Sequence, residues 1–189
     1  MSIVRLPALV GLLVLSASLI GCASPGSGSP AQQNLLWQES EAAVTRFKAR
    51  DPGMQRWFDE SAGYAVFPSV GKGGLWVGGA HGHGTVYEQG ILVGHASMTQ
   101  VTVGLQAGAQ AYQEIIFFEH TAALERFQRG NYEVAAQVGG VVVTVGASTT
   151  AEYQDGVAIF TMPRGGLMYE ASVGGQKFAY RPLTSPTPQ

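Results

Sequence analysis

GYAVFPSVGKGGLWVGGAHGHG, residues 63–84, is the stretch that decides the fold. It is rich in glycine, contains several aromatic residues and has one formal charge, at Lys72. A helix is excluded, because each glycine costs a helix about 1 kcal/mol relative to alanine. A flexible linker is excluded, because the stretch is too apolar and aromatic. We therefore predict extended chain that bends sharply or whose backbone closely approaches other backbone.

The composition of the whole chain indicates one folded domain with a leader. Its 189 residues are 46% apolar and only 13% charged, against about 25% charged residues in a typical domain. The 26 glycines are spread through apolar runs, which excludes a disordered or collagen-like chain. A single cysteine excludes an intramolecular disulfide.

The first 21 residues have the pattern of a secretory signal, with Arg5 before an apolar run at 6–15. This run is too short for a transmembrane helix, which needs about 20 apolar residues. Cys22 follows Leu-Ile-Gly, which resembles the bacterial lipobox. The resemblance implies that the Cys22 thiol is the lipid attachment site, that the leader is cut before it, and that the new amino group is acylated. The alternative is an ordinary signal peptide with an incidental cysteine.

Residues 22–33 are expected to form a flexible tether, because 23–30 contain only Ala, Ser, Pro and Gly. Acyl chains on Cys22 would anchor the protein at about 0.8 kcal/mol per buried methylene. Ala23 replaces the Asp that retains Gram-negative lipoproteins at the inner membrane, so the resemblance implies an outer-membrane protein facing the periplasm. Without Arg5 the chain has ten basic and thirteen acidic residues, a net charge of −3. This balance argues against nonspecific nucleic-acid binding.

The folded domain is expected at 34–182, with a disordered tail at 183–189. A helix is predicted at 35–50 with Asn34 as its cap, and a second short helix from Met54 to near Gly63, with Met54, Trp57 and Phe58 in the core. A third helix is predicted at 119–130, capped by Thr121. Short β-branched and aromatic runs predict strands at 64–67, 75–80, 85–87, 91–95, 100–105, 112–118, 138–146, 157–162, 167–173 and 177–180.

This order of elements favours an α+β fold with a mainly antiparallel sheet, open or barrel-like, an N-terminal helix and one or two short helices. Residues 87–91 predict a hairpin connection. Residues 100–103 alternate polar and apolar, which predicts one wet and one buried face. The bases Arg46, Lys48 and Arg50 are either a patch for anionic lipid or ordinary complements of the helix dipole.

Motifs for catalysis are weak or absent. The segment around Lys72 lacks the spacing of a phosphate-binding loop, no dinucleotide-binding glycine motif occurs, and Glu170 replaces the first glycine of a hydrolase elbow around Ser172. His81 and His83 would share one side of a strand, and with His95 could form a metal site; the alternative is polar surface. Three acids near a strand-to-helix passage are either an acid/base set or helix-terminal charges: Glu114, Glu119 and Glu125.

Several blocks, in order, resemble the SYLF family, also called the Ysc84 lipid-binding domain. They are GYAVFP at 63–68, GKGG at 71–74, GGA at 78–80 followed by Gly82 and Gly84, GLQAGAQ at 104–110, EIIFF at 114–118 and GLMYEASVGGQK at 166–177. The resemblance covers about residues 37–182. It implies binding of phosphoinositides or other anionic lipids, as in eukaryotic members, some of which also bind actin. It implies an envelope role for a member with a lipoprotein leader, and no enzymatic activity or cofactor. A periplasmic protein would meet no actin, so that activity is not carried over.

Four residues are candidates for contact with an anionic phospholipid or phosphoinositide-like headgroup. Lys72 stands among glycines whose N–H groups could form an anion-binding concavity, and Trp76 suits a membrane interface. Arg164 and Lys177 each lie beside glycine-rich turns. The hypothesis is that some of them meet on one face; the alternative is scattered solvated charges with Trp76 in the core. Two further functions stay open: a structural or protein-interaction module of the envelope, and a His-dependent metal-binding protein.

Overall fold

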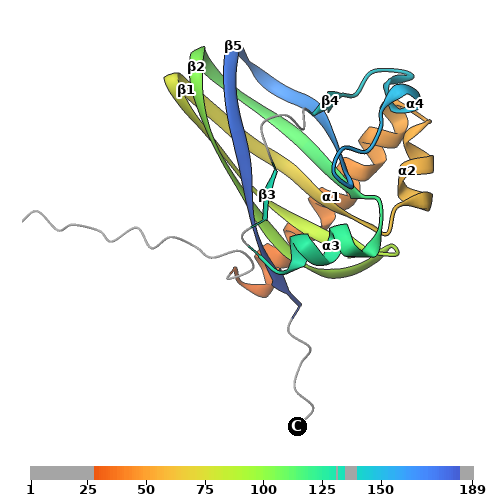
Figure 1. The fold of residues 1–189 in the computed structure, drawn as a ribbon. Coiled ribbons are helices and arrows are strands. Elements are labelled where there is room, and N and C mark those ends of the chain that lie inside the picture. Colours follow the sequence, from red (N-terminus) through yellow and green to blue (C-terminus); the bar gives the residue numbers. More distant parts are fainter. Residues whose placement is uncertain (1–27, 131, 135–139, 184–189) are drawn as a thin grey trace, which may run out of the picture.

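Three long strands form most of the sheet in the computed structural model, which describes residues 28–130, 132–134 and 140–183 (Figure 1). These strands are β1 (Gly63–Glu88), β2 (Ile91–Phe118) and β5 (Val157–Pro182). β2 lies between the other two and is antiparallel to both. Two short strands also pair with β5: β3 (Tyr132–Val134) antiparallel and β4 (Val141–Val142) parallel. The sheet curves into a half-barrel, so the α+β fold with a mainly antiparallel, barrel-like sheet is confirmed.

Each long strand joins runs that the sequence predicts as separate strands. Pro68 and Ser69, predicted to be a break, lie in an irregularity of β1 between Phe67 and Val70. Proline has no N–H to donate to the ladder, and at such a bulge no ladder hydrogen bond is required of it. The expected hairpin between β1 and β2 is confirmed, with Gln89 and Gly90 at φ 49° and 80°. Of the strand predicted at 138–146, residues 138 and 139 lie outside the described residues, and only β4 is a strand in the rest.

β1 folds back on itself, and glycines make this possible. A Cβ on Gly84 would lie 2.4 Å from the carbonyl oxygen of Val66, and one on Gly63 would lie 2.4 Å from that of Tyr87. The two halves of β1 therefore touch through their backbones. The strand turns over near Gly74, whose Cβ would lie 2.4 Å from Gly78 Cα. The prediction of a sharp bend with close backbone approach is confirmed.

The N-terminal helix α1 (Pro30–Arg50) begins earlier than predicted. Ser29 rather than Asn34 is its cap: the Ser29 hydroxyl accepts from Gln32 N, and Ser29 N donates to Gln32 Oε1 at 2.7 Å. This capping box and a proline at the first helical position define the start. Residues 30–33, expected in the tether, are therefore helical. At the other end, Asp51 caps the helix.

Three shorter helices complete the fold: α2 (Met54–Glu60), α3 (Thr121–Gln128) and α4 (Ala147–Thr150). α2 ends before the predicted Gly63. α3 is capped by His120, whose Nδ1 accepts from Ala123 N at 3.1 Å, and not by Thr121. The last strand extends beyond its predicted end at residue 180, because Pro182 pairs with Gly94 and Leu183 N donates to Val93 O. The predicted tail at 184–189 lies outside the described residues.

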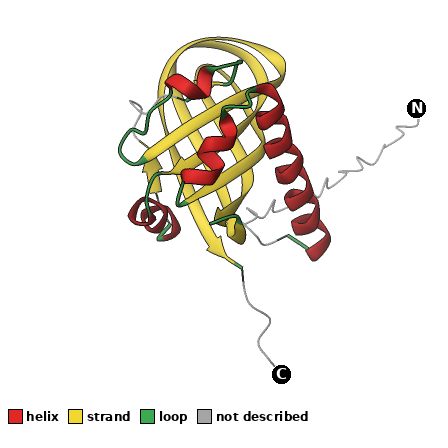
Figure 2. Cartoon of the chain, turned by 90° about the vertical axis from the view of Figure 1, so that its right-hand side faces the viewer, coloured by secondary structure: helices red, strands yellow, loops and turns green. Residues whose placement is uncertain are grey.

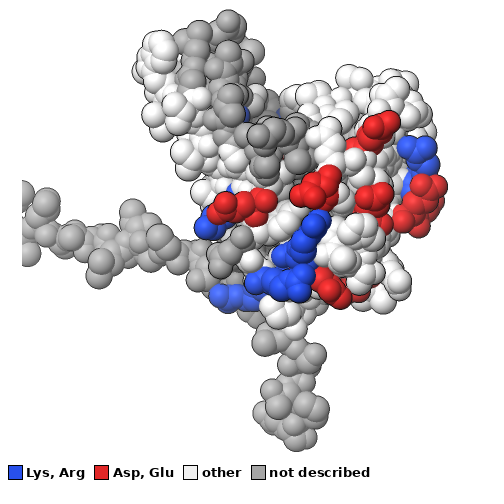
Figure 3. Space-filling view, viewed as in Figure 1, with Lys and Arg blue, Asp and Glu red and all other residues white. Residues whose placement is uncertain are grey.

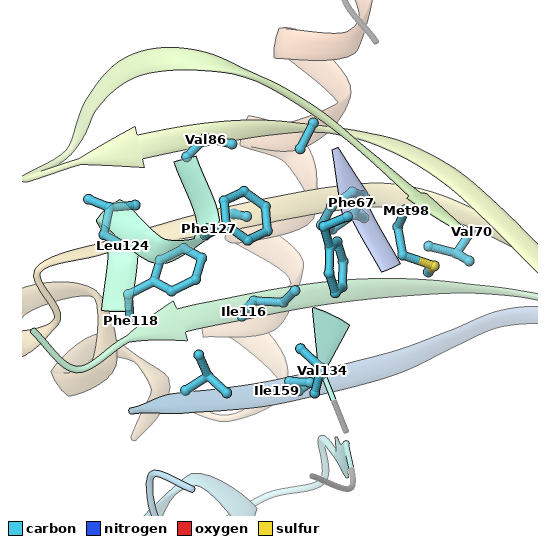
Figure 4. Close-up of a cluster of buried hydrophobic side chains, with 14 of the residues drawn as sticks. Phe67, Val70, Val86, Met98, Ile116, Phe118, Leu124, Phe127, Val134 and Ile159 are labelled. Carbon is cyan, nitrogen blue, oxygen red and sulfur yellow. The ribbon is translucent and has the colours of Figure 1, made fainter. Parts of the chain in front are cut away.

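Two apolar cores lie on opposite faces of the sheet. The inner core fills the half-barrel, where Phe67, Met98 and Ile116 meet Leu124 and Phe127 of α3 (Figure 4). The outer core lies under α1 and α2, which cover the outside of the sheet (Figure 2). As predicted, Met54 and Trp57 are buried, and Phe58 packs against them. In the described part of the chain, no helix combines the length and apolar character needed to span a bilayer.

Candidate functional site

The most unusual surface is where the sheet turns over, at the upper end in Figure 1. Five large apolar side chains there are 60–68% exposed: Leu75, Trp76, Val77, Val101 and Val103. They come from adjacent strands, because Val77 pairs with Val103 and Gly79 pairs with Val101. We call these five residues the apolar tip. Contiguous exposed apolar surface on a folded protein commonly marks a site of contact with a partner or membrane.

Trp76 reaches this position through an unusual backbone. Its φ is 64°, in the left-handed region that side chains other than glycine's rarely adopt. The register of β1 against β2 also shifts between Leu75 and Val77. These irregularities turn the strand and leave the Trp76 ring in solvent instead of in the core. In Figure 3 the charged side chains of the described residues gather on the body of the molecule.

Below the tip, the inner face of the half-barrel is polar. Lys72 follows Val70 by two residues without a shift, so its side chain points inward. Glu114 is fully buried on the same face and accepts from Gln176 Nε2 at 2.9 Å. Burial raises the pKa of Glu114 to about 7, although the Gln176 hydrogen bond and the Lys72 charge act to lower it. Glu114 Oε1 and Gln176 Oε1 are buried without hydrogen-bond partners among the described residues.

This polar interior reverses the expected faces of residues 100–103. The alternation is present, but Thr102 is buried while Val101 and Val103 are exposed. Thr102 and Glu114 occupy inward positions on β2, so polar groups line the inside at this end. Valines at the alternate positions must then face solvent. The predicted wet face is therefore the inner one, and the predicted buried face forms part of the apolar tip.

The structure does not gather the four predicted headgroup residues into one cluster. Lys72 points inward and acts on Glu114, whereas Trp76 lies at the tip. Arg164 donates through Nη1 to Pro68 O at 3.0 Å. Lys177 points outward, because it alternates with the inward Phe178, and its Nζ lies 3.2 Å from Glu133 Oε1. Each of the three cations thus interacts with a group of the protein, and Trp76 is exposed.

His81 and His83 lie side by side on the outer face of β1, as the i, i+2 spacing predicts. Their Nε2 atoms are 3.3 Å apart, and the rings meet edge to face with centroids at 4.8 Å. His81 Nδ1 lies 3.4 Å from Thr99 Oγ1 on the neighbouring strand. Burial, and to a lesser degree the neighbouring His81, lower the pKa of His83. The neutral form of the His83 imidazole is therefore favoured more than in a free histidine.

The predicted third imidazole does not join this pair. His95 is buried and its Nδ1 has no hydrogen-bond partner in the described part of the chain. Among the described residues, no three His, Cys, Asp or Glu side chains gather as a metal site. The three-histidine site suggested by the sequence is therefore wrong, and this removes the metal-dependent enzyme built on it.

A second surface feature is a cleft of about 270 Å³ between α2 and the segment after α4. It is lined by Arg56, Trp57, Glu60, Glu119, Glu152 and Tyr153, among others. Glu119 therefore belongs to this cleft, whereas Glu114 lies inside the half-barrel, so the two do not form the acid/base set considered from the sequence. Sequence reasoning also missed the Glu114–Gln176 pair. The sequence does contain a sign that Glu114 faces inward: it is two and four residues from Ile116 and Phe118, which point into the inner core, and strand residues at this spacing share a face.

The predicted leader at 1–21 and the predicted lipid attachment site Cys22 lie outside the described residues.

The bases near the end of α1 make contacts within the domain. Arg46 Nε donates to Gln113 Oε1 at 3.1 Å, and Lys48 Nζ lies 4.4 Å from the Phe58 ring centroid. Both side chains thus interact with the domain itself. Lys48 and Arg50 also lie in the last turn, where they complement the helix dipole.

Comparison with known proteins now identifies the domain. A model of the Ysc84 family, described as "Las17-binding protein actin regulator", matches residues 99–183, from the second half of the β1–β2 hairpin to the end of β5. A similar curated protein is Beta cell expansion factor A of Aeromonas veronii, 31% identical over 141 residues. That match covers 74% of this chain and 53% of the relative, so the chain spans about half the length of the curated relative. The chain belongs to the Ysc84 (SYLF) family.

Proposed function

We propose that this protein is a non-enzymatic lipoprotein of the bacterial envelope whose SYLF domain binds the surface of a phospholipid bilayer. The observation that carries the proposal is the apolar tip, with five large apolar side chains exposed together at one end of the sheet. Full burial of such a side chain is worth about 1.5–3 kcal/mol. Tryptophan in particular favours the headgroup level of a membrane. Insertion of the tip would therefore offset the cost of ordering the domain on the bilayer.

Anionic headgroups are the lipid class we propose, with attraction from local cations, because the net charge of the chain is −2. Lys72, the nearest of these cations along β1, is three residues from Leu75. Arg164 and Lys177 lie on β5, with Lys177 paired to Glu133. We expect these cations to add a salt-dependent component to an interaction that rests mainly on apolar contact.

The anchor is the second part of the proposal. Cys22, through its lipobox, would carry acyl chains and hold the chain at the outer membrane on the periplasmic side. Two or more chains give stable anchoring, whereas one gives only reversible binding. The tip would then bind a bilayer in addition to the anchor.

Vesicle flotation of a form without the acyl chains tests lipid binding by the domain. We expect the protein to float with phosphatidylglycerol vesicles and less with phosphatidylcholine vesicles. Val77→Asp should reduce the floating fraction at least about fivefold, because a charge would enter the apolar region. Ile91→Asp is the matched control: Ile91 is 69% exposed but lies at the start of β2 beside the hairpin turn, opposite Glu88 and far from Val77 along β1. Equal loss in both variants would contradict a role for the tip.

Charge reversal separates headgroup attraction from apolar insertion in the same assay. Lys177→Glu should weaken binding to anionic vesicles and leave binding to neutral vesicles nearly unchanged. Lys72→Gln, which removes the charge without adding a carboxylate beside Glu114, should have the same effect. Equal retention of the wild type by neutral and anionic vesicles would contradict the preference for anionic headgroups, but it would remain consistent with insertion of the tip.

A protein-interaction module is the second candidate function. The same exposed tip would suit a protein partner, and the family description names a binding protein. Absence of wild-type binding to vesicles of either composition would favour this function over lipid binding.

A further inference from the structure

We infer that His81 and His83 form a two-imidazole site for a zinc ion on the outer face of β1. Their Nε2 atoms face each other across 3.3 Å. Two zinc–nitrogen bonds of about 2.0–2.1 Å at a tetrahedral angle place the nitrogens about 3.3–3.4 Å apart. The two ligand atoms are thus already separated as tetrahedral coordination requires. Because one Nε2 donates to the other in the metal-free protein, binding needs rotation of the rings and transfer of that proton, through solvent, to Nδ1 of His83.

Thr99 supports the required tautomer of His81. Its hydroxyl oxygen lies 3.4 Å from His81 Nδ1, on the residue directly opposite in the β1–β2 ladder. A proton on Nδ1 that donates to this oxygen leaves the lone pair on Nε2, the atom that faces His83. Metal-binding histidines usually have such a partner on the second ring nitrogen, and it fixes the ring orientation.

The backbone between the two histidines is held firmly. A Cβ on Gly82 would lie 2.9 Å from Val70 Cγ2 and 3.0 Å from Ser69 O. β1 therefore packs closely on its own first half at this residue, with room only for glycine. Because strand residues i and i+2 point to one side, both imidazoles remain on the outer face.

Neighbouring charges do not oppose a cation here. Lys177 is opposite Thr99 on β5, but Glu133 lies 3.2 Å from its Nζ and balances its charge. Solvent completes the coordination, because the described residues offer no third ligand of the His, Cys, Asp or Glu type. The site is therefore open, and it lies next to the apolar tip on the outer face, because Thr99 is two residues from Val101 on β2.

Isothermal titration of the untagged full chain with zinc chloride at pH 7.5 tests the inference. We expect about one zinc ion per chain. His81→Gln and His83→Gln should each weaken binding at least about tenfold, because each removes one of two ligands. Thr99→Val should weaken it by up to about tenfold through loss of the supporting hydrogen bond.

His120→Asn is the matched control. It removes one imidazole elsewhere and keeps a side chain that can cap α3, so its zinc affinity should equal that of the wild type. Nitrogen-15 spectra of wild-type imidazoles add a readout that needs no variant: zinc should shift Nε2 of both His81 and His83. No zinc binding by the wild type, unchanged affinity in both glutamine variants, or shifts at other histidines only would overturn the inference.

Discussion

Glu114 shows how one residue can differ from what its sequence neighbours suggest. It lies among apolar residues of a strand and near a helix start, where a surface carboxylate is a reasonable expectation. Its parity instead places it inside the half-barrel, where Gln176 Nε2 donates to it at 2.9 Å. Burial raises its pKa to about 7. The folded protein therefore binds the Glu114 proton more tightly than the unfolded chain does.

This difference predicts that Glu114 makes stability depend on pH. Because the folded pKa of about 7 exceeds the ordinary 4.5, its stabilising effect is full below pH 4.5 and is lost as pH rises to 7. Between pH 5 and 8 we expect this group to lower the free energy of unfolding by about 1–3 kcal/mol. Glu114→Gln keeps the hydrogen bond without the titration. Urea unfolding of both proteins at pH 5 and 8 should show the smaller change in the variant; equal changes would contradict the prediction.

The residue scale is also where sequence reasoning is weakest. Val101 and Thr102 alternate as strand residues do, so their side chains point to opposite faces of the sheet. The alternation does not say which face is buried. The apolar residue is usually the buried one, but here Thr102 is buried and Val101 is exposed. The cause is long-range: Glu114 and Gln176 approach the same inner region from other parts of the chain. No local pattern around Val101 contains that information.

At the scale of the element, β1 depends on glycine where its two halves touch. Gly84→Ala would place a methyl group 2.4 Å from Val66 O and 2.8 Å from the Phe67 ring, so one half of the strand must move. We expect a loss of about 1–3 kcal/mol in the free energy of unfolding. Gly71→Ala is the control from the same strand, because its new Cβ would meet nothing within 4 Å. Similar unfolding midpoints for the two variants in urea would contradict the close packing of β1.

Elements were predicted better than their boundaries. Glycine and aromatic residues at 63–84 indicated a bent strand, and the spacing of Met54, Trp57 and Phe58 indicated a helix against the core. The break expected at Pro68 was wrong because a bulge absorbs proline within a strand. The start of α1 was missed because Ser29 and Gln32 form a capping box inside a segment whose composition indicates a tether. Local composition and hydrogen bonding compete there, and the hydrogen bonds win.

At the scale of the whole molecule, the lipobox predicts attachment to a membrane. Cys22→Ser should leave the protein unprocessed or soluble, because the thiol that receives the diacylglycerol is absent. Cell fractionation locates each form, and intact-mass measurement of the wild type should show a chain that begins at Cys22 and carries acyl groups. A wild-type chain with an unmodified Cys22 would contradict the prediction, and the zinc and vesicle experiments would be unaffected.

The start of α1 and the apolar tip lie at opposite ends of the domain in both ribbon views (Figures 1 and 2). Ser29 is seven positions after Cys22, so the chain between them can span at most about 25 Å. From Gly63 to Leu75 β1 advances twelve residues, or about 40 Å at 3.3 Å per residue. If Cys22 is acylated as proposed, the segment between the anchor and α1 is shorter than the domain. An upright domain would then present its tip to a facing surface, as a spacer between two layers does, and would reach its own bilayer only by lying down.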